Sequence, residues 1–177
     1  MRLLRSNNSL AIVAALLCSA CIPTTDQQLA VKASSMNTCD KVKALIAGYG
    51  DGFQVLQGQR RSTRYGDMWS ARYDVVGKGC EIWRLGDNST YYVCNRIAPD
   101  QETAAHYYDE ARELLHSCLD QDWRETEAPR AANGNLKTVF ATASTRATFS
   151  VRAIKTEGVF KQQWSVYYWV GDQHDQL

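Results

Sequence analysis

The chain has 177 residues, of which 45% are hydrophobic and 22% charged, and its formal net charge is +1 at pH 7. Arg2 and Arg5 are the only charged residues among the first 20, so 20 basic residues minus these two leaves 18, against 19 acidic residues. This near-neutral remainder argues against a protein that binds nucleic acid or another polyanion. Beyond residue 37 about 140 residues remain, the size of one ordinary domain with its own core.

Residues 1–20 have the layout of an export signal. Arg2 and Arg5 precede the apolar run LAIVAALL, and small residues follow it, which is the order found in cleaved secretory signals. The run is shorter than the ~20 residues that a helix needs to cross a bilayer, and no later stretch is long and apolar enough to do so. We therefore expect an exported chain whose mature part does not span a membrane.

The signal ends in Cys18-Ser19-Ala20-Cys21. This stretch resembles the lipobox of bacterial lipoproteins, in which two small residues precede a cysteine that is lipidated and becomes the new N-terminus. It departs from the family pattern at Cys18, where Leu is usual. The resemblance covers the signal alone and implies acyl chains on Cys21 that anchor the protein to a membrane. Ile22 then implies, by the family's sorting rule, the outer membrane with the domain facing the periplasm.

Ordinary secretion is the alternative, because Cys18 and Ala20 are also small enough for a standard signal peptidase and would give a soluble periplasmic or secreted protein. In either case residues 23–37 are mostly small and polar, so we expect 21–37 to be the processed N-terminus followed by a flexible tether. A single domain over residues 38–171 follows, and residues 172–177 are expected to be a disordered tail.

Two amphipathic helices are predicted. The first begins at Asn37 or Thr38 and continues as an apolar stripe to Leu56, although three glycines weaken it. The second occupies residues 100–123, with Asp100 as its N-cap. Its apolar face consists of Ala104, Tyr107, Tyr108, Ala111, Leu114, Leu115 and Cys118.

Strand-like runs follow each helix. Their apolar alternation predicts strands over residues 68–76, 80–85 and 90–97, and then over 138–143, 147–154 and 163–170. The last run is apolar on both faces, which is typical of a central strand. The predicted fold is therefore α+β, with an antiparallel sheet, two antiparallel helices packed on it, and the order α-β-β-β-α-β-β-β.

Four cysteines remain beyond Cys21, and an even number in an exported chain predicts two disulfides. Sequence alone allows three connectivities. If the turn between the second and third strands has an odd number of residues centred on Asp87, Cys80 lies opposite Cys94. The other two cysteines begin the first helix and end the second, so antiparallel helices would bring them together. The favoured bridges are Cys39–Cys118 and Cys80–Cys94.

The second helix carries the main cluster of titratable side chains, namely His106, Asp109, Glu113 and His116, all on one helical face. This face lies opposite the apolar one, and the first helix offers no histidine or glutamate to complete a metal site. A solvated helix face explains the cluster. We predict no catalytic residue, metal or cofactor, and thus no enzyme.

Two groups of residues are candidates for binding. The segment QGQRRSTRYG contains Arg60, Arg61 and Arg64, which would suit anionic headgroups or an acidic partner if it is not simply a solvated loop. Exposed aromatic side chains are favoured interface anchors, unless they belong to the core. The aromatic candidates are Tyr91, Tyr92, Tyr167 and Trp169.

These observations predict an exported envelope lipoprotein whose domain is a non-enzymatic protein-binding or structural module in the periplasm. The expected partners are the membrane, through the N-terminal lipid, and an unidentified envelope or incoming protein, with no nucleic acid. The first alternative is an inhibitor or immunity protein that neutralises a toxin or hydrolase. An enzyme with an unrecognised site is the second. Sequence alone leaves the oligomeric state open.

Overall fold

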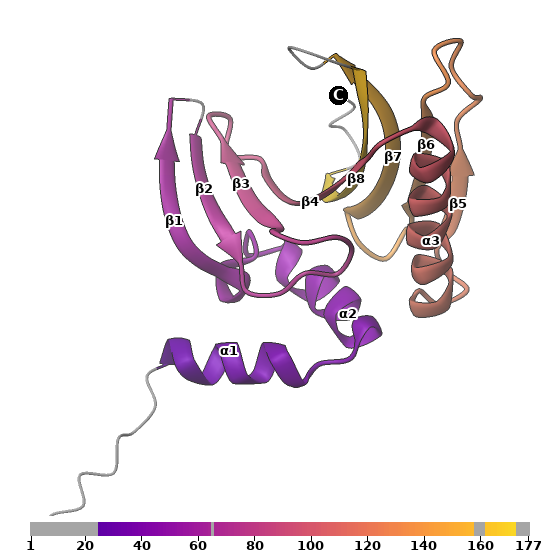
Figure 1. The fold of residues 1–177 in the computed structure, drawn as a ribbon. Coiled ribbons are helices and arrows are strands. Elements are labelled where there is room, and N and C mark those ends of the chain that lie inside the picture. Colours follow the sequence, from indigo (N-terminus) through magenta and orange to yellow (C-terminus); the bar gives the residue numbers. More distant parts are fainter. Residues whose placement is uncertain (1–24, 65, 158–161, 173–177) are drawn as a thin grey trace, which may run out of the picture.

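A computed structural model describes residues 25–64, 66–157 and 162–172 of the chain (Figure 1). Over these residues the fold is one antiparallel sheet of eight strands with three α-helices and two disulfides. The elements in chain order are α1 (Thr25–Ser35), α2 (Thr38–Tyr49), the short 3-10 helix η1 (Gln54–Leu56), β1 (Gln57–Thr63), β2 (Gly66–Ala71), β3 (Glu81–Leu85), β4 (Thr90–Ala98), α3 (Gln101–Cys118), β5 (Arg124–Glu127), β6 (Leu136–Ala141), β7 (Ala147–Glu157) and β8 (Gln162–Asp172).

The sheet has the order β1-β2-β3-β4-β8-β7-β6-β5. Each half of the chain is a helix followed by four consecutive strands, and the two halves meet where β4 pairs with β8 at the centre. The sequence predicted three strands after each helix, and the two that it missed, β1 and β5, are the sheet edges. An edge strand exposes both faces, so QGQRRST lacks the apolar alternation on which the prediction depended.

The first predicted helix is shorter than its apolar stripe. α2 begins where Asn37 Oδ1 accepts a hydrogen bond from the backbone N–H of Asp40 at 2.8 Å, and it ends at Tyr49. There the backbone N–H of Phe53 donates to Gly48 O at 2.7 Å, and Gly52 and Phe53 adopt φ values of 69° and 60°. The chain therefore turns at Gly52 and Phe53. The last apolar residues of the predicted stripe, Phe53 and Leu56, lie beyond the end of the helix.

Part of the segment expected to be a flexible tether is helical. α1 covers residues 25–35 and places Ala33, which is 5% exposed, in the core. Its sequence TDQQLAVKASS contains good helix formers and neither glycine nor proline. Small polar side chains suggested a linker, but helix propensity and one buried alanine order this stretch. The predicted signal, Cys21 and the rest of the tether to residue 24 lie outside the described residues, as do residues 173–177 of the predicted tail.

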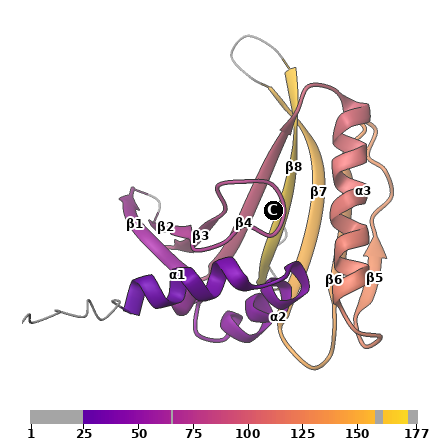
Figure 2. The ribbon, with the colours of Figure 1, turned by 60° about the horizontal axis from the view of Figure 1, so that its bottom comes forward.

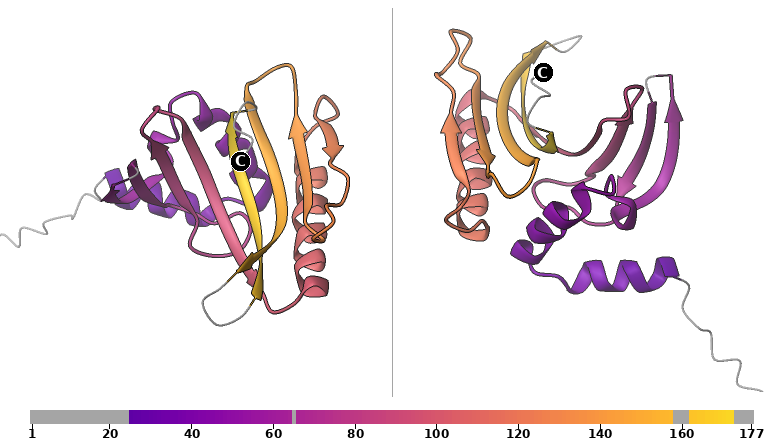
Figure 3. Two further views of the ribbon diagram at one scale, coloured as in Figure 1. Left: turned by 90° about the horizontal axis from the view of Figure 1, so that it is seen from above. Right: turned by 180° about the vertical axis from the view of Figure 1, so that it is seen from behind.

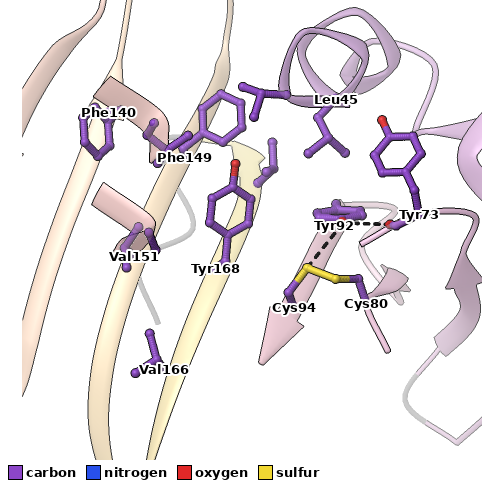
Figure 4. Close-up of a cluster of buried hydrophobic side chains, with 14 of the residues drawn as sticks. Leu45, Tyr73, Cys80, Tyr92, Cys94, Phe140, Phe149, Val151, Val166 and Tyr168 are labelled. Atoms are coloured by element: carbon purple, nitrogen blue, oxygen red, sulfur yellow. Dashed lines mark hydrogen bonds between the residues drawn. A yellow bond between two sulfur atoms is a disulfide. The ribbon is translucent and has the colours of Figure 1, made fainter. Parts of the chain in front are cut away.

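Helices α2 and α3 cover the same face of the sheet (Figure 2). Side chains alternate along each strand, so every second residue enters the core between the sheet and these helices. Figure 4 shows this core, in which Tyr92 of β4, Phe149 of β7 and Tyr168 of β8 approach Leu45 of α2. The helix-facing residues of β8 are Trp164, Val166, Tyr168 and Val170.

Both disulfides that the sequence favoured are present. Cys39 in the first turn of α2 bonds to Cys118 at the end of α3, as expected for helices that run in opposite directions. In the β3–β4 hairpin Arg84 pairs with Thr90 and Glu81 with Val93, a register centred on Asp87. This register continues to Cys80 and Cys94, which form the second bridge.

Two buried tyrosines in this core differ in how their hydroxyl groups are satisfied. Tyr92 Oη donates to Tyr73 O at 3.0 Å and accepts from the backbone N–H of Val75 at 3.2 Å (Figure 4). Tyr168 Oη is buried and has no hydrogen-bond partner among the described residues. Burial raises the pKa of Tyr168 well above its usual value, so the group stays neutral.

We expect Tyr168→Phe to raise the free energy of unfolding by about 1 kcal/mol, because the substitution removes a buried hydroxyl that gains no hydrogen bond. The matched variant Tyr92→Phe should lower it by ~1–2 kcal/mol, because the N–H of Val75 would lose its acceptor. Urea titrations of both variants measure the two values. Destabilisation by Tyr168→Phe would contradict the unfavourable role assigned to its hydroxyl.

Candidate binding face

The face of the sheet opposite α2 and α3 carries no helix in the part of the chain that the structure describes, and it is concave (Figure 3). We call it the open face. The strand register places on it the residues that alternate with the core, among them Trp83 of β3, Tyr91 of β4 and Trp169 of β8. It is therefore a hollowed surface built from the central strands of both halves.

An aromatic cluster forms the middle of the open face. The ring of Trp169 lies 5.1 Å from that of Tyr91 and meets the Trp83 ring edge-on at 5.7 Å, measured between ring centroids. Trp83 Nε1 donates to a Glu81 carboxylate oxygen at 2.9 Å, and Glu81 also pairs with Arg61. These contacts fix the orientation of Trp83. Edge-to-face packing of this kind adds ~0.5–1.5 kcal/mol beyond burial.

The cluster depends on a glycine in the neighbouring strand. A Cβ atom added to Gly171 would lie 2.3 Å from Tyr91 Cδ1, so a larger residue at this position would displace the Tyr91 ring. Tyr91 is only 2% exposed although none of the described helices covers it. Gly171 therefore lets the Tyr91 ring approach the backbone of β8 closely beside Trp169.

A cavity of about 510 Å³ continues the cluster towards the β1–β2 hairpin. Met68 and Trp83, which are paired across β2 and β3, form its floor together with Leu85. Arg64 also lines it, whereas the guanidinium of Arg84 lies on the other face of the sheet, over the Trp69 ring. The cavity is of the size that takes a large apolar side chain, and its lining is almost wholly apolar.

A polar row crosses the open face next to the cluster. Lys137 of β6 pairs with Arg152 of β7, Arg152 with Tyr167 of β8, and Tyr167 with Asn95 of β4. Arg152 Nε donates to Ser150 Oγ at 3.2 Å. Burial lowers the pKa of Lys137, and the neighbouring charge of Arg152 lowers it further. Burial likewise lowers the pKa of Arg152.

The predicted arginine segment is divided by the structure. Arg60 lies on the helix side of β1 and forms an ion pair with Asp67 at 2.7 Å, which holds the pKa of that carboxyl below its usual value. Arg61 lies on the open face with Glu81, and Arg64 lines the cavity beside the hairpin. Residues 57–63 of the segment form strand β1 and not a loop, so Arg60 and Arg61 point to opposite faces, and Arg64 lies in the turn that follows.

The four predicted aromatic residues are also divided. Tyr167 and Trp169 lie partly exposed on the open face, and Tyr91 lies on the same face but is almost fully buried beneath its neighbours. Tyr92 is fully buried among the helix-facing side chains, so neither Tyr91 nor Tyr92 is available for direct binding. Neighbours in a strand point to opposite faces, so Tyr91 and Tyr92 could not share a surface. The sequence analysis missed Met68, Trp83, Lys137 and Arg152. The sequence shows that side chains alternate along these strands, but it does not show which face of each strand the helices cover.

Several polar side chains of α3 form hydrogen bonds and ion pairs along its exposed side. His116 Nε2 lies 2.6 Å from Glu125, which Arg112 also contacts at 2.6 Å, and His106 Nε2 lies 3.2 Å from Glu110. Among the described residues no group of three or more His, Cys, Asp or Glu side chains is arranged to hold a metal ion. This side of the helix is a network of charges that ties α3 to the edge strand β5.

A second hollow, of about 630 Å³, lies between α3 and the loop before β3, beside the Cys39–Cys118 bridge. Two of its charged residues satisfy each other, since Arg96 pairs with Glu110 at 2.8 Å, and the guanidinium carbon of Arg96 lies over the Tyr107 ring at 3.2 Å from its centroid. A ligand that bound Arg96 or Glu110 would have to break this ion pair. The open face instead presents the partly exposed rings of Trp83 and Trp169, which need no rearrangement. We therefore regard the open face as the stronger candidate.

The fold and this face define an α+β domain in which an antiparallel sheet is covered by helices on one side and presents an aromatic hollow on the other. Comparison with protein-family models, curated proteins and solved structures finds no match to this chain. None of the described helices is long and apolar enough to cross a membrane.

Proposed function

We propose that this chain is an exported envelope lipoprotein, anchored through Cys21, whose domain binds another polypeptide through the open face. The observation that carries the binding proposal is the pair of partly exposed rings of Trp83 and Trp169, packed against the buried Tyr91, on the concave face of the sheet that none of the described helices covers. Tryptophan and tyrosine held rigid in a hollow are the side chains that dominate the energetics of protein interfaces. The two disulfides fit an oxidising compartment outside the cytoplasm.

The open face also offers what a polypeptide partner needs besides aromatic surface. The cavity beside Met68 accepts a large side chain, and the polar row through Asn95 and Tyr167 provides hydrogen-bonding groups. On the helix side, the charged groups on the outside of α3 and the guanidinium of Arg96 already form ion pairs, so fewer of them are available to a partner. An inhibitor or immunity protein would use the same face, with an incoming toxin or hydrolase as its partner.

The first test is photocrosslinking in intact cells, with benzoylphenylalanine in place of Tyr167 on the open face or in place of Lys43 on the exposed side of α2. We expect a discrete crosslinked protein from position 167 and none from position 43. Trp169→Ala should weaken binding of that protein at least tenfold without preventing folding. Equal crosslinking from both positions, or binding unchanged by Trp169→Ala, would refute the open face as the binding site.

Membrane extracts of the same cells test the lipid anchor. The measurement is the intact mass of the wild-type protein compared with that of Cys21→Ser. Acyl mass on the wild type alone, with crosslinking that Cys21→Ser reduces, supports a function at the membrane. An unlipidated wild type that crosslinks the same protein would leave the binding proposal standing but refute the lipid anchor. The identity of the crosslinked protein separates an envelope component from a toxin or hydrolase.

A further inference from the structure

We infer that the Cys39–Cys118 bridge is a site of thiol–disulfide exchange, at which a small-molecule thiol opens this bridge in the folded protein while the Cys80–Cys94 bridge stays closed. The inference goes beyond the proposed function, because it does not depend on what the open face binds. Its basis is the different burial of the two bridges and the place of the first one in the second hollow.

The two bridges differ in how far solvent reaches them. Cys80 and Cys94 are 2% and 1% exposed, and Tyr92 Oη lies 3.3 Å from Cys94 Sγ within the core (Figure 4). Cys118 is 9% exposed, and Cys39 is more exposed than that. Exchange requires an attacking sulfur to reach the bridge. Burial therefore protects Cys80–Cys94 as long as the core stays closed.

The exposed bridge forms part of the wall of the second hollow. Both of its cysteines line this hollow of about 630 Å³, together with their neighbours Thr38 and Ser117, which have small side chains. The volume lies within the range of sites that take small molecules. A small thiol can therefore approach the bridge through the hollow without unfolding of the domain.

The two helix ends set the direction of the exchange. Cys39 lies in the first turn of α2, where the partial positive charge of the helix N-terminus stabilises a thiolate. Cys118 is the last residue of α3, where the partial negative charge of the C-terminus disfavours one. The sulfur that is the more stable thiolate leaves faster. The incoming thiolate therefore bonds to Cys118 Sγ, the bond between the two cysteines breaks, and Cys39 leaves as a thiolate.

A second thiol completes the reduction. Its thiolate bonds to the sulfur of the first thiol, the mixed disulfide breaks, and Cys118 leaves and takes up a proton. The two thiols become one disulfide, their two electrons reduce the bridge, and their two protons pass to the cysteines or to the solvent. The product has no covalent link between α2 and α3, so packing alone holds these two helices of different halves together.

The test treats the purified oxidised protein with reduced glutathione, blocks free thiols with N-ethylmaleimide at timed intervals, and maps the cysteines by mass spectrometry. In native buffer Cys39 and Cys118 should be released about tenfold faster than Cys80 and Cys94. Early samples should carry glutathione on Cys118 and maleimide on Cys39. Urea near the unfolding midpoint should abolish the difference in rate. Equal rates for the two bridges without urea, or earlier release of Cys80 and Cys94, would overturn the inference.

A matched pair of variants tests the route through the hollow. Glu113 is exposed and lines the hollow, so its carboxylate repels an incoming thiolate, and Glu113→Gln should raise the rate of Cys39–Cys118 reduction about twofold. Glu102→Gln removes an exposed acid from the other end of α3 and should leave the rate unchanged. Equal rates for the two variants would refute this route. Reduction by the protein dithiol thioredoxin but not by glutathione would overturn the assignment to a small thiol.

Discussion

Simultaneous replacement of Cys39 and Cys118 by alanine is expected to lower the free energy of unfolding by about 4 kcal/mol, because their bridge closes a loop with a sequence separation of 79. A cross-link of this span removes much of the conformational freedom of the unfolded chain. It also joins α2 of one half to α3 of the other, and the strand pairing of β4 with β8 is the main further link between the halves. Denaturant titration of the oxidised wild type and the double variant measures the difference.

The second bridge provides the matched comparison. Cys80 and Cys94 are separated by 14 residues within one hairpin, so their replacement by alanine should cost about 3 kcal/mol, less than the longer bridge. The β3–β4 register should persist, since strand pairing and the turn also specify it. A larger loss from the hairpin bridge than from Cys39–Cys118 would contradict the dependence on loop length.

Phe149→Ala is expected to destabilise the domain by ~3–5 kcal/mol. Phe149 is fully buried on the helix side of β7, where its ring lies 5.3 Å from that of Trp123 and 5.9 Å from that of Tyr168. Its removal would leave a cavity between the sheet and the segment that follows α3, and close packing prevents complete collapse of that cavity. The loss appears as a lower denaturant midpoint with an unchanged slope.

The control lies on the same strand but on the open face. Ile154 is only partly buried there, so Ile154→Ala should cost roughly 1 kcal/mol. The comparison tests whether the side chains on the helix-covered face supply most of the stability of the domain. If they do, the residues of the open face can be selected for binding. Equal losses from both variants would contradict this division of roles.

The sequence predicted the features that depend on local pattern. The caps at Asn37 and Asp100 begin helices, the apolar run of β8 lies at the centre of the sheet, and the turn centred on Asp87 aligns Cys80 with Cys94. These features follow from hydrogen bonding and alternation within a few residues. The edge strand β1 does not, because its pairing with β2 is decided by tertiary contacts and leaves no apolar periodicity.

The candidate site was predictable only in part, for a related reason. Alternation separates Tyr91 from Tyr92 in any strand, but which of them faces the helices depends on the register of β4 against β8. Lys137 and Arg152 lie in segments 15 residues apart, and only the pairing of β6 with β7 makes them neighbours. The role of Gly171 depends on a ring from the other half of the chain.

The order of the strands also sets when the domain can form as its chain emerges N-terminus first, whether from the ribosome or, under the proposed function, from an export channel. Cys80 and Cys94 can join as soon as their hairpin is outside, since both lie in neighbouring strands. β4 must wait for β8, the last strand of the fold, and Cys39 must wait for Cys118. Until the last strand has emerged, the edge of β4 that pairs with β8 therefore stays open, and an open edge of a central strand is prone to aggregation and is the kind of surface that chaperones cover.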